Sequence, residues 1–369
     1  MPAATPARGV WLHATDPALT PALRVLAGHL AERPEAPPTS VTGDAATPGP
    51  GDDLRAIDAA FDRFPARLLV LAGAALPAAL MDRARARNIA LMLIEAAPPS
   101  ARGGWRLFPV QPRGQLARFQ QIHARDEAAA TALRRQVRDA VPVLATGRLA
   151  RHAPVPGCNI QELDAMRQSI GARPVWLAHD LPEAEADAAF LAHSHALRRA
   201  HRLLMIAQPR DPAGGATLAG RAAEVGFVCA RRSADEEIDE TTQVYVADAG
   251  DDPGLFLRLA PVTFLGGSLT AGAPIPSPVI PAALGSALVF GPHAEGDEGR
   301  FMDQLRVQGG GRQINGPSDL GPAVSALLSP EAGADAALRA WSLATDGSEA
   351  TLAVTEAICD WLRLNGGMR

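Results

Sequence analysis

Short apolar runs alternate along the chain with longer segments in which alanine and leucine recur at helical spacing. The short runs are apolar at nearly every position, which is typical of strands buried on both faces of a parallel sheet. We therefore predict an α/β fold of doubly wound sheets. The predicted strands are Gly9–His13, Arg67–Leu71, Ile89–Ile94, Val141–Ala145, Val175–Ala178, Leu203–Ile206, Phe227–Ala230, Thr242–Val246, Val262–Leu265 and Ala287–Phe290.

The segments between these runs predict the helices and the domain boundaries. Pro- and Gly-rich stretches predict a loop at Thr42–Asp53 and an interdomain linker at Thr146–Asn159. We expect one domain in residues 1–160, a second in 161–340, and a last segment, 341–369, that packs back toward the first domain. The predicted helices are Pro21–Glu32, Leu76–Arg87, Asp126–Val137, Glu183–Ala200, Ala216–Val225, Gly254–Leu259, Ile280–Gly285, Phe301–Val307, Gly321–Leu328 and a final one, Ala336–Leu364.

Composition narrows the classes of function. All 35 basic residues are arginine, so mechanisms that need a lysine nucleophile or a P-loop lysine are excluded. The net charge of −5, without a basic stripe, argues against a nucleic-acid partner. The three cysteines are far apart and predict neither a disulfide framework nor a zinc site. No segment predicts a signal peptide or a membrane span, so we expect a cytoplasmic protein without a transmembrane anchor.

A glycine-rich turn offers the first candidate binding site. Gly266–Leu269 reads GGSL and follows a buried strand, so backbone N–H groups near Gly267 and the Ser268 hydroxyl could meet a phosphate in the cleft between the two domains. A tight turn without a ligand needs the same glycines. Ser277 precedes a predicted helix whose N-terminus could face the same cleft.

Charged residues at other strand ends add candidates. Arg210, after Pro209, follows a predicted strand and suits a bidentate phosphate contact, although a solvated loop arginine explains it equally well. Asp248, Asp251 and Asp252 cluster after another strand, where a polar turn is a simpler explanation than a metal site.

Taken in order, several segments resemble the Kdo (3-deoxy-D-manno-octulosonate) transferase family. The opening WLHA resembles the family's first strand, and TGRL at Thr146–Leu149 is similar to its T-G-N-L-K. Pro209 and Arg210 match the start of its P-R-H-P-E-R. Further matches are RRS at Arg231–Ser233, GGSL at Gly266–Leu269, and PAALG followed by FGPH between Pro281 and His293.

This resemblance implies a GT-B glycosyltransferase, with two Rossmann-like domains facing across a cleft. It implies transfer of Kdo from CMP-Kdo to a lipid A precursor at the inner-membrane surface, without a metal or other cofactor. Pro209 and Arg210 would contact the CMP phosphate. Gly250, Asp251, Asp252 and Ser277 stand where the family has residues of the nucleotide pocket.

The chain also departs from the family at positions that carry chemistry. The family's general-base glutamate falls on Leu19, so Asp16 is the nearby carboxylate that could act as base. Both carboxylates of E-T-E-L-W-P are absent from Ala72–Pro77, and the lysine of G-N-L-K falls on Ala150. Two alternatives therefore stay open. One is a catalytically degenerate paralogue that binds nucleotides or acts as a scaffold in envelope assembly, and the other is an enzyme with an altered donor or acceptor.

Overall fold

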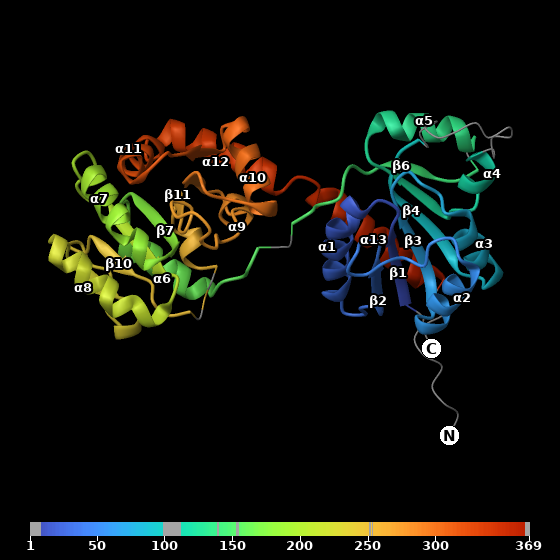
Figure 1. The fold of residues 1–369 in the computed structure, drawn as a ribbon, viewed down its shortest axis with the longest axis horizontal. Helices are drawn as coiled ribbons and strands as arrows, with labels where there is room; N and C mark the ends of the chain where they lie inside the picture. Colours follow the sequence, from blue (N-terminus) through green and yellow to red (C-terminus); the bar gives the residue numbers. More distant parts are fainter. Residues whose placement is uncertain are drawn as a thin grey trace, which may run out of the picture. The chain divides into compact units, whose positions relative to one another are not determined.

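The computed structural model describes residues 9–98, 112–138, 140–152, 155–250, 252 and 254–365 (Figure 1). The chain forms two compact domains, each with its own parallel sheet. Met1–Pro154 and Asp346–Arg369 form the first domain, and Val155–Thr345 forms the second. The prediction of two Rossmann-like α/β domains is confirmed.

The first domain contains a six-stranded sheet in the order β2-β1-β3-β4-β5-β6. All neighbouring strands are parallel. The strand order reverses between β1 and β3, the kind of position at which ligands of doubly wound sheets bind. The strands are β1 (Gly9–Ala14), β2 (Thr39–Thr42), β3 (Ala66–Ala72), β4 (Ala90–Ala96), β5 (Gln121–Ala124) and β6 (Val143–Ala145).

Helices cover both faces of this sheet. One face packs against α2, α3 and α5, and the other packs against α1 and the C-terminal helix α13 (Figure 1). Asp53 and Asp126 start α2 and α5 by accepting hydrogen bonds from N–H groups of the first helical turn. The helices are α1 (Thr20–Ala31), α2 (Leu54–Arg63), α3 (Ala78–Ala86), α4 (Pro112–Leu116), α5 (Glu127–Val137) and α13 (Ser348–Asn365).

The second domain contains a seven-stranded sheet in the order β13-β12-β11-β7-β8-β10-β9. Its pairings are also parallel. The first strand of the domain, β7, lies in the middle, so the strand order reverses between β11 and β7. The strands are β7 (Val175–Leu181), β8 (Leu204–Pro209), β9 (Cys229–Arg231), β10 (Val244–Val246), β11 (Val262–Leu265), β12 (Ala287–Phe290) and β13 (Gly311–Gln313).

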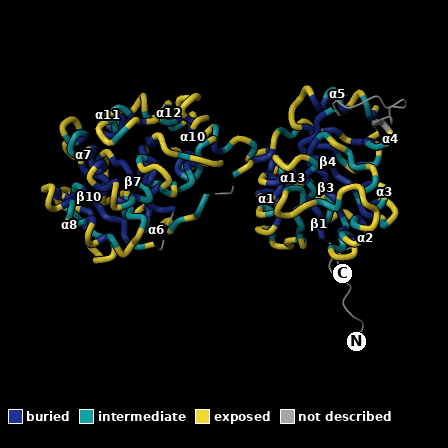
Figure 2. The backbone as a smooth tube through the Cα atoms, viewed as in Figure 1, coloured by how far each residue is buried: buried dark blue, intermediate teal, exposed yellow. Residues whose placement is uncertain are grey.

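The core of the second domain lies on both faces of its sheet, where the inner strands are buried along most of their length (Figure 2). The largest fully buried side chains include Trp176, Phe190 and Phe264. The helices are α6 (Ile160–Ile170), α7 (Ala186–Leu197), α8 (Gly215–Val225), α9 (Val279–Ala283), α10 (Gly296–Gln308), α11 (Pro317–Leu327) and α12 (Pro330–Ala344).

Some predicted elements differ from the structure. The predicted final helix is two helices, α12 and α13, because Gly347 adopts a left-handed φ of 82° between them. A Cβ at Gly347 would lie 2.5 Å from the backbone oxygen of Arg148, so only glycine fits this turn. The predicted helix Gly254–Leu259 is only a single 3-10 turn, Phe256–Arg258. Among the described residues, no helix is both long and apolar enough to cross a bilayer.

Two buried histidines predict how stability depends on pH. Burial lowers the pKa of both His123 and His193 from 6.5 to about 4. Between these values the unfolded chain binds protons that the folded chain does not, so stability rises with pH. We expect the free energy of unfolding to fall by about 2 kcal/mol per histidine from pH 7.5 to pH 5.0. Urea denaturation followed by tryptophan fluorescence at both pH values measures this loss.

The matched variants are His123→Asn and His193→Asn, each in a different domain. In each variant, the free energy of unfolding should fall by about 2 kcal/mol less between pH 7.5 and pH 5.0 than in wild type, whatever the variant's stability at pH 7.5. An unchanged pH dependence in either variant would show that the histidine it replaces does not cause the effect.

Candidate functional site

The second domain brings charged side chains together at the carboxyl ends of β7, β8 and β11. This is the point where the strand order reverses, and ligands of such sheets bind there. Asp180 lies at the end of β7 with a left-handed φ of 51°, in an irregularity of the β7–β8 pairing between Ala178 and Leu181. Because left-handed conformations are unfavourable for residues other than glycine, this geometry is held by the surrounding contacts.

Arg210, directly after β8, bridges these strand ends. Its Nε and Nη2 atoms donate to the same oxygen of Asp180, Oδ2, at 2.9 and 2.7 Å. Nη2 also donates to the backbone oxygen of Pro274 at 2.8 Å. The structure gives Nη1 no partner among the described residues, and the side chain is 26% exposed. A fixed guanidinium with one free N–H edge suits an incoming phosphate oxygen.

The amides of the glycine-rich turn after β11 already bind a carboxylate of the chain. Glu185, 3% exposed, lies just before α7 and accepts hydrogen bonds from the N–H of Gly267 at 2.8 Å and the N–H of Leu269 at 3.0 Å. The Thr270 hydroxyl donates to the same carboxylate at 2.9 Å. The amides that the sequence suggested for a phosphate are therefore occupied by a carboxylate of the chain itself.

Ser268 is buried in the same turn. Its hydroxyl donates to the backbone oxygen of Leu265 at 2.5 Å and accepts from the N–H of Gly291 at 2.8 Å. The first hydrogen bond closes the turn after β11, and the second joins that turn to the segment after β12. The structure thus places Gly267 and Ser268 in contacts within the domain, and a nucleotide phosphate would have to displace Glu185 to reach Gly267.

The remaining nucleotide-pocket candidates lie in separate places. Pro209 and Arg210 line a pocket of about 250 Å³ with the apolar side chains of Leu181 and Leu218. Asp252 accepts from the N–H of Asn159 at 2.8 Å, so it holds the start of α6. Gly250 is exposed, Asp251 lies outside the described residues, and Ser277 is half-buried two residues before α9, a helix of only five residues.

The arginines at the end of β9, Arg231 and Arg232, take part in two separate networks. Arg231 donates to the buried Asp248 at 2.8 Å, and the Ser233 hydroxyl donates to the same carboxylate oxygen. Burial alone would raise the pKa of Asp248, but the hydrogen bonds from Ser233 and Arg231 lower it below its ordinary value. Asp248 is therefore a structural carboxylate that orders the loops after β9 and β10.

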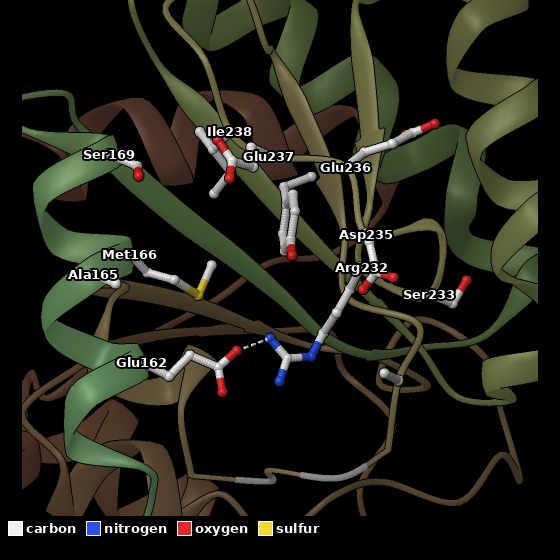
Figure 3. A pocket seen from close by; sticks show the side chains of 12 residues that line it. Glu162, Ala165, Met166, Ser169, Arg232, Ser233, Asp235, Glu236, Glu237 and Ile238 are labelled. Carbon is white, nitrogen blue, oxygen red and sulfur yellow. Dashed lines mark hydrogen bonds and ion pairs between the residues drawn. The ribbon is translucent and has the colours of Figure 1, made fainter.

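An open pocket of about 680 Å³ lies between α6 and the segment after β9. Figure 3 shows Glu162 and Met166 on α6, with Arg232 reaching across to hydrogen-bond Glu162. Arg232 also stacks over the Phe256 ring, 5.3 Å from its centroid. The other charged residues that line the pocket are acidic: Asp235, Glu236 and Glu237. This pocket therefore suits a neutral or cationic group better than a phosphate.

In the first domain, Asp16 lies just beyond β1, at the reversal of strand order. It is exposed and accepts a hydrogen bond from the N–H of Ala18 at 3.0 Å. Nearby His13 shares the Thr42 hydroxyl with Trp11, and burial lowers the pKa of His13. Ala150 is buried, and its N–H bonds to the backbone oxygen of Gly347 at 3.1 Å.

Sequence reasoning missed Asp180, Glu185 and Glu162. An acidic residue directly after an apolar strand was a usable signal for Asp180, as it was for Arg210. Nothing local marks Glu185, because its partners lie more than 80 residues further along the chain. Among the described residues, no group of three or more His, Cys, Asp or Glu side chains could hold a metal ion.

The comparisons with known proteins agree with the motifs. The 3-deoxy-D-manno-octulosonic acid transferase of Haemophilus influenzae is 29% identical over 157 residues. This chain is similar to Kdo transferases. The match covers 42% of the chain and 36% of that transferase, so it spans about a third of the relative's length. No protein-family model matches the chain.

Several solved structures are also similar to this chain. The C-terminal CMP-Kdo binding domain of WaaA from Acinetobacter baumannii is 22% identical, with a TM-score of 0.45, and the match covers 50% of this chain and 96% of that one. MurG of Acinetobacter baumannii is 13% identical, with a TM-score of 0.45 and coverage of 96% and 99%. At these TM-scores the matches add nothing to the fold described above.

The contacts of Glu185 predict a large loss of stability when its side chain is removed. Glu185→Ala leaves two backbone N–H groups and one hydroxyl in the turn without their acceptor. We expect the free energy of unfolding to fall by about 3 kcal/mol or more. Glu183→Ala is the matched control, because the Glu183 side chain is 80% exposed. Urea denaturation compares them, and equal losses would contradict a special role for Glu185.

Proposed function

We propose that the chain is a glycosyltransferase that uses a nucleotide-activated sugar. The observation that carries this proposal is the similarity to a Kdo transferase. Arg210 supports it, because the family motif and the geometry select the same side chain independently. The motif matches Pro209 and Arg210, and the structure holds the guanidinium at the reversal of strand order, where Nη1 has no partner among the described residues.

We propose CMP-Kdo as the donor and a lipid A precursor at the inner-membrane surface as the acceptor. In this reaction an acceptor hydroxyl attacks the anomeric carbon of Kdo, and the bond from that carbon to the CMP phosphate oxygen breaks. CMP leaves with the electron pair, and Arg210 stabilises the charge on its phosphate. The hydroxyl proton passes to a base, for which Asp16 is the candidate because of its position beyond β1.

Nucleotide binding tests the first half of the proposal. In titration calorimetry we expect wild-type protein to bind CMP and Arg210→Gln to bind it about tenfold more weakly, because the phosphate loses a charged donor. Arg167→Gln is the matched control, since Arg167 lies exposed on α6 and its one ion-pair partner among the described residues is Asp164, at 3.7 Å. A folded wild-type protein that fails to bind millimolar CMP would refute the proposal.

Transfer tests the second half. CMP release from CMP-Kdo is measured with and without the lipid A precursor, for wild type and Asp16→Asn. We expect acceptor-dependent release that falls by about 100-fold or more in Asp16→Asn, as for loss of a general base. Full activity of the variant would reject Asp16 as the base. CMP binding without any transfer would instead favour a degenerate, nucleotide-binding paralogue.

A further inference from the structure

The segment after β6 is attached to the first domain at several points. Thr146 hydrogen-bonds His123 at 2.7 Å, and the N–H of Leu149 donates to Glu95 at 2.5 Å. The N–H of Ala150 donates to the Thr351 hydroxyl, at the start of α13, at 2.8 Å. Leu149 and Ala150 are buried, at 3% and 5% exposure. The backbone between residues 148 and 151 is therefore fixed from two sides.

Two exposed arginines, Arg148 and Arg151, flank this fixed backbone. Within the described part of the chain, neither forms an ion pair or a hydrogen bond. Some other arginines of this domain do so, as Arg24 does with Asp44 at 2.6 Å and Arg118 with Asp82 at 2.5 Å. Among the described residues, Arg148 and Arg151 thus place two positive charges without ion-pair partners on a fixed backbone, in a chain of net charge −5.

Glu95 lies among these arginines in an unusual backbone geometry. It has a left-handed φ of 49° and lies where the β4–β5 pairing is irregular, between Leu93 and Ala96. Bulges at strand ends redirect a side chain, and strain of this kind gathers at functional sites. Glu95 is 8% exposed, and the bulge directs its carboxylate to the Leu149 N–H.

Electrostatics show that the arginines are close to Glu95. Burial raises the pKa of Glu95 above its ordinary value, while the hydrogen bond from Leu149 and the charges of Arg148, Arg151 and Arg125 act in the opposite direction. Arg125 is exposed and lies 3.4 Å from its neighbour Asp126. The single carboxylate of Glu95 therefore interacts with three arginines, of which Arg125 also has Asp126 nearby.

We propose that Arg148 and Arg151, with Arg125 beside them, bind a phosphomonoester of the acceptor, and that Glu95 is a positioning residue that fixes the backbone between them. Calling the anion an acceptor rests on the proposed function. The anion site itself rests on the contacts of the first domain. Two exposed guanidinium groups on a fixed backbone suit a phosphate dianion, because each can donate two parallel hydrogen bonds.

Vesicle binding tests the site. Full-length protein is sedimented with phosphatidylcholine vesicles, with and without phosphatidic acid, whose headgroup is a phosphomonoester. We expect phosphatidic acid to raise binding and the double variant Arg148→Gln/Arg151→Gln to lose about tenfold in affinity. Arg55→Gln/Arg135→Gln is the matched control, because it removes the same charge from exposed positions of the same domain. An equal loss in the control would overturn the proposal.

Titration with inorganic phosphate separates a lipid phosphate from a soluble one. A loss in the Arg148/Arg151 variant on vesicles supports the acceptor assignment. A loss with inorganic phosphate alone, and none on vesicles, overturns it. These assays need neither CMP nor turnover. Absent CMP binding therefore refutes the proposed function without changing the anion result, and absent anion binding refutes this inference alone.

The Glu95 variants test positioning. Glu95→Ala should weaken vesicle binding, and Glu95→Gln should restore it, because the glutamine oxygen can still accept from the Leu149 N–H. A merely structural role would lower the melting temperature of Glu95→Ala and leave the affinity of the folded protein unchanged. If Glu95→Ala does not fold, Glu95→Gln still decides, since weak binding by this variant at wild-type stability would contradict the positioning role.

Discussion

In each domain, a buried carboxylate accepts hydrogen bonds from loop amides at the carboxyl edge of the sheet and so stabilises those loops. A parallel sheet ends in loops whose backbone N–H groups need partners once they are buried. Glu185 supplies that partner for the turn after β11, and Glu95 supplies it for the segment after β6. In each case the glutamate comes from a different segment of the chain, so the loop can hold its conformation only when the whole domain is folded.

This arrangement changes how a glycine-rich turn should be interpreted. The GGSL turn has amides that converge on an anion, but that anion is Glu185. The cationic group that remains available at the same strand ends is Arg210, which Asp180 orients through two hydrogen bonds to one oxygen. The turn itself ties the end of β11 to Glu185, directly before α7.

The two domains share a second device, a strained acidic residue at the end of a strand. Asp180 follows an irregularity at the end of β7, and Glu95 follows one at the end of β4, both with left-handed φ. Each acidic side chain is associated with arginines, Arg210 in one domain and Arg148 and Arg151 in the other. In the absence of lysine, arginine is the only side chain here that remains a cation at all physiological pH values.

The sequence by itself determined the fold class, because continuous apolar runs of strand length are buried on both faces wherever they occur. All ten predicted strands coincide with observed ones to within a few residues, whereas β2, β5 and β13 were missed because they are short or partly polar. Arg210 could be predicted because its signal is local, a basic residue after a strand. Only the tertiary structure decided the roles of Glu185 and Glu95, because their amide partners lie 82 and 54 residues away and no local pattern connects them.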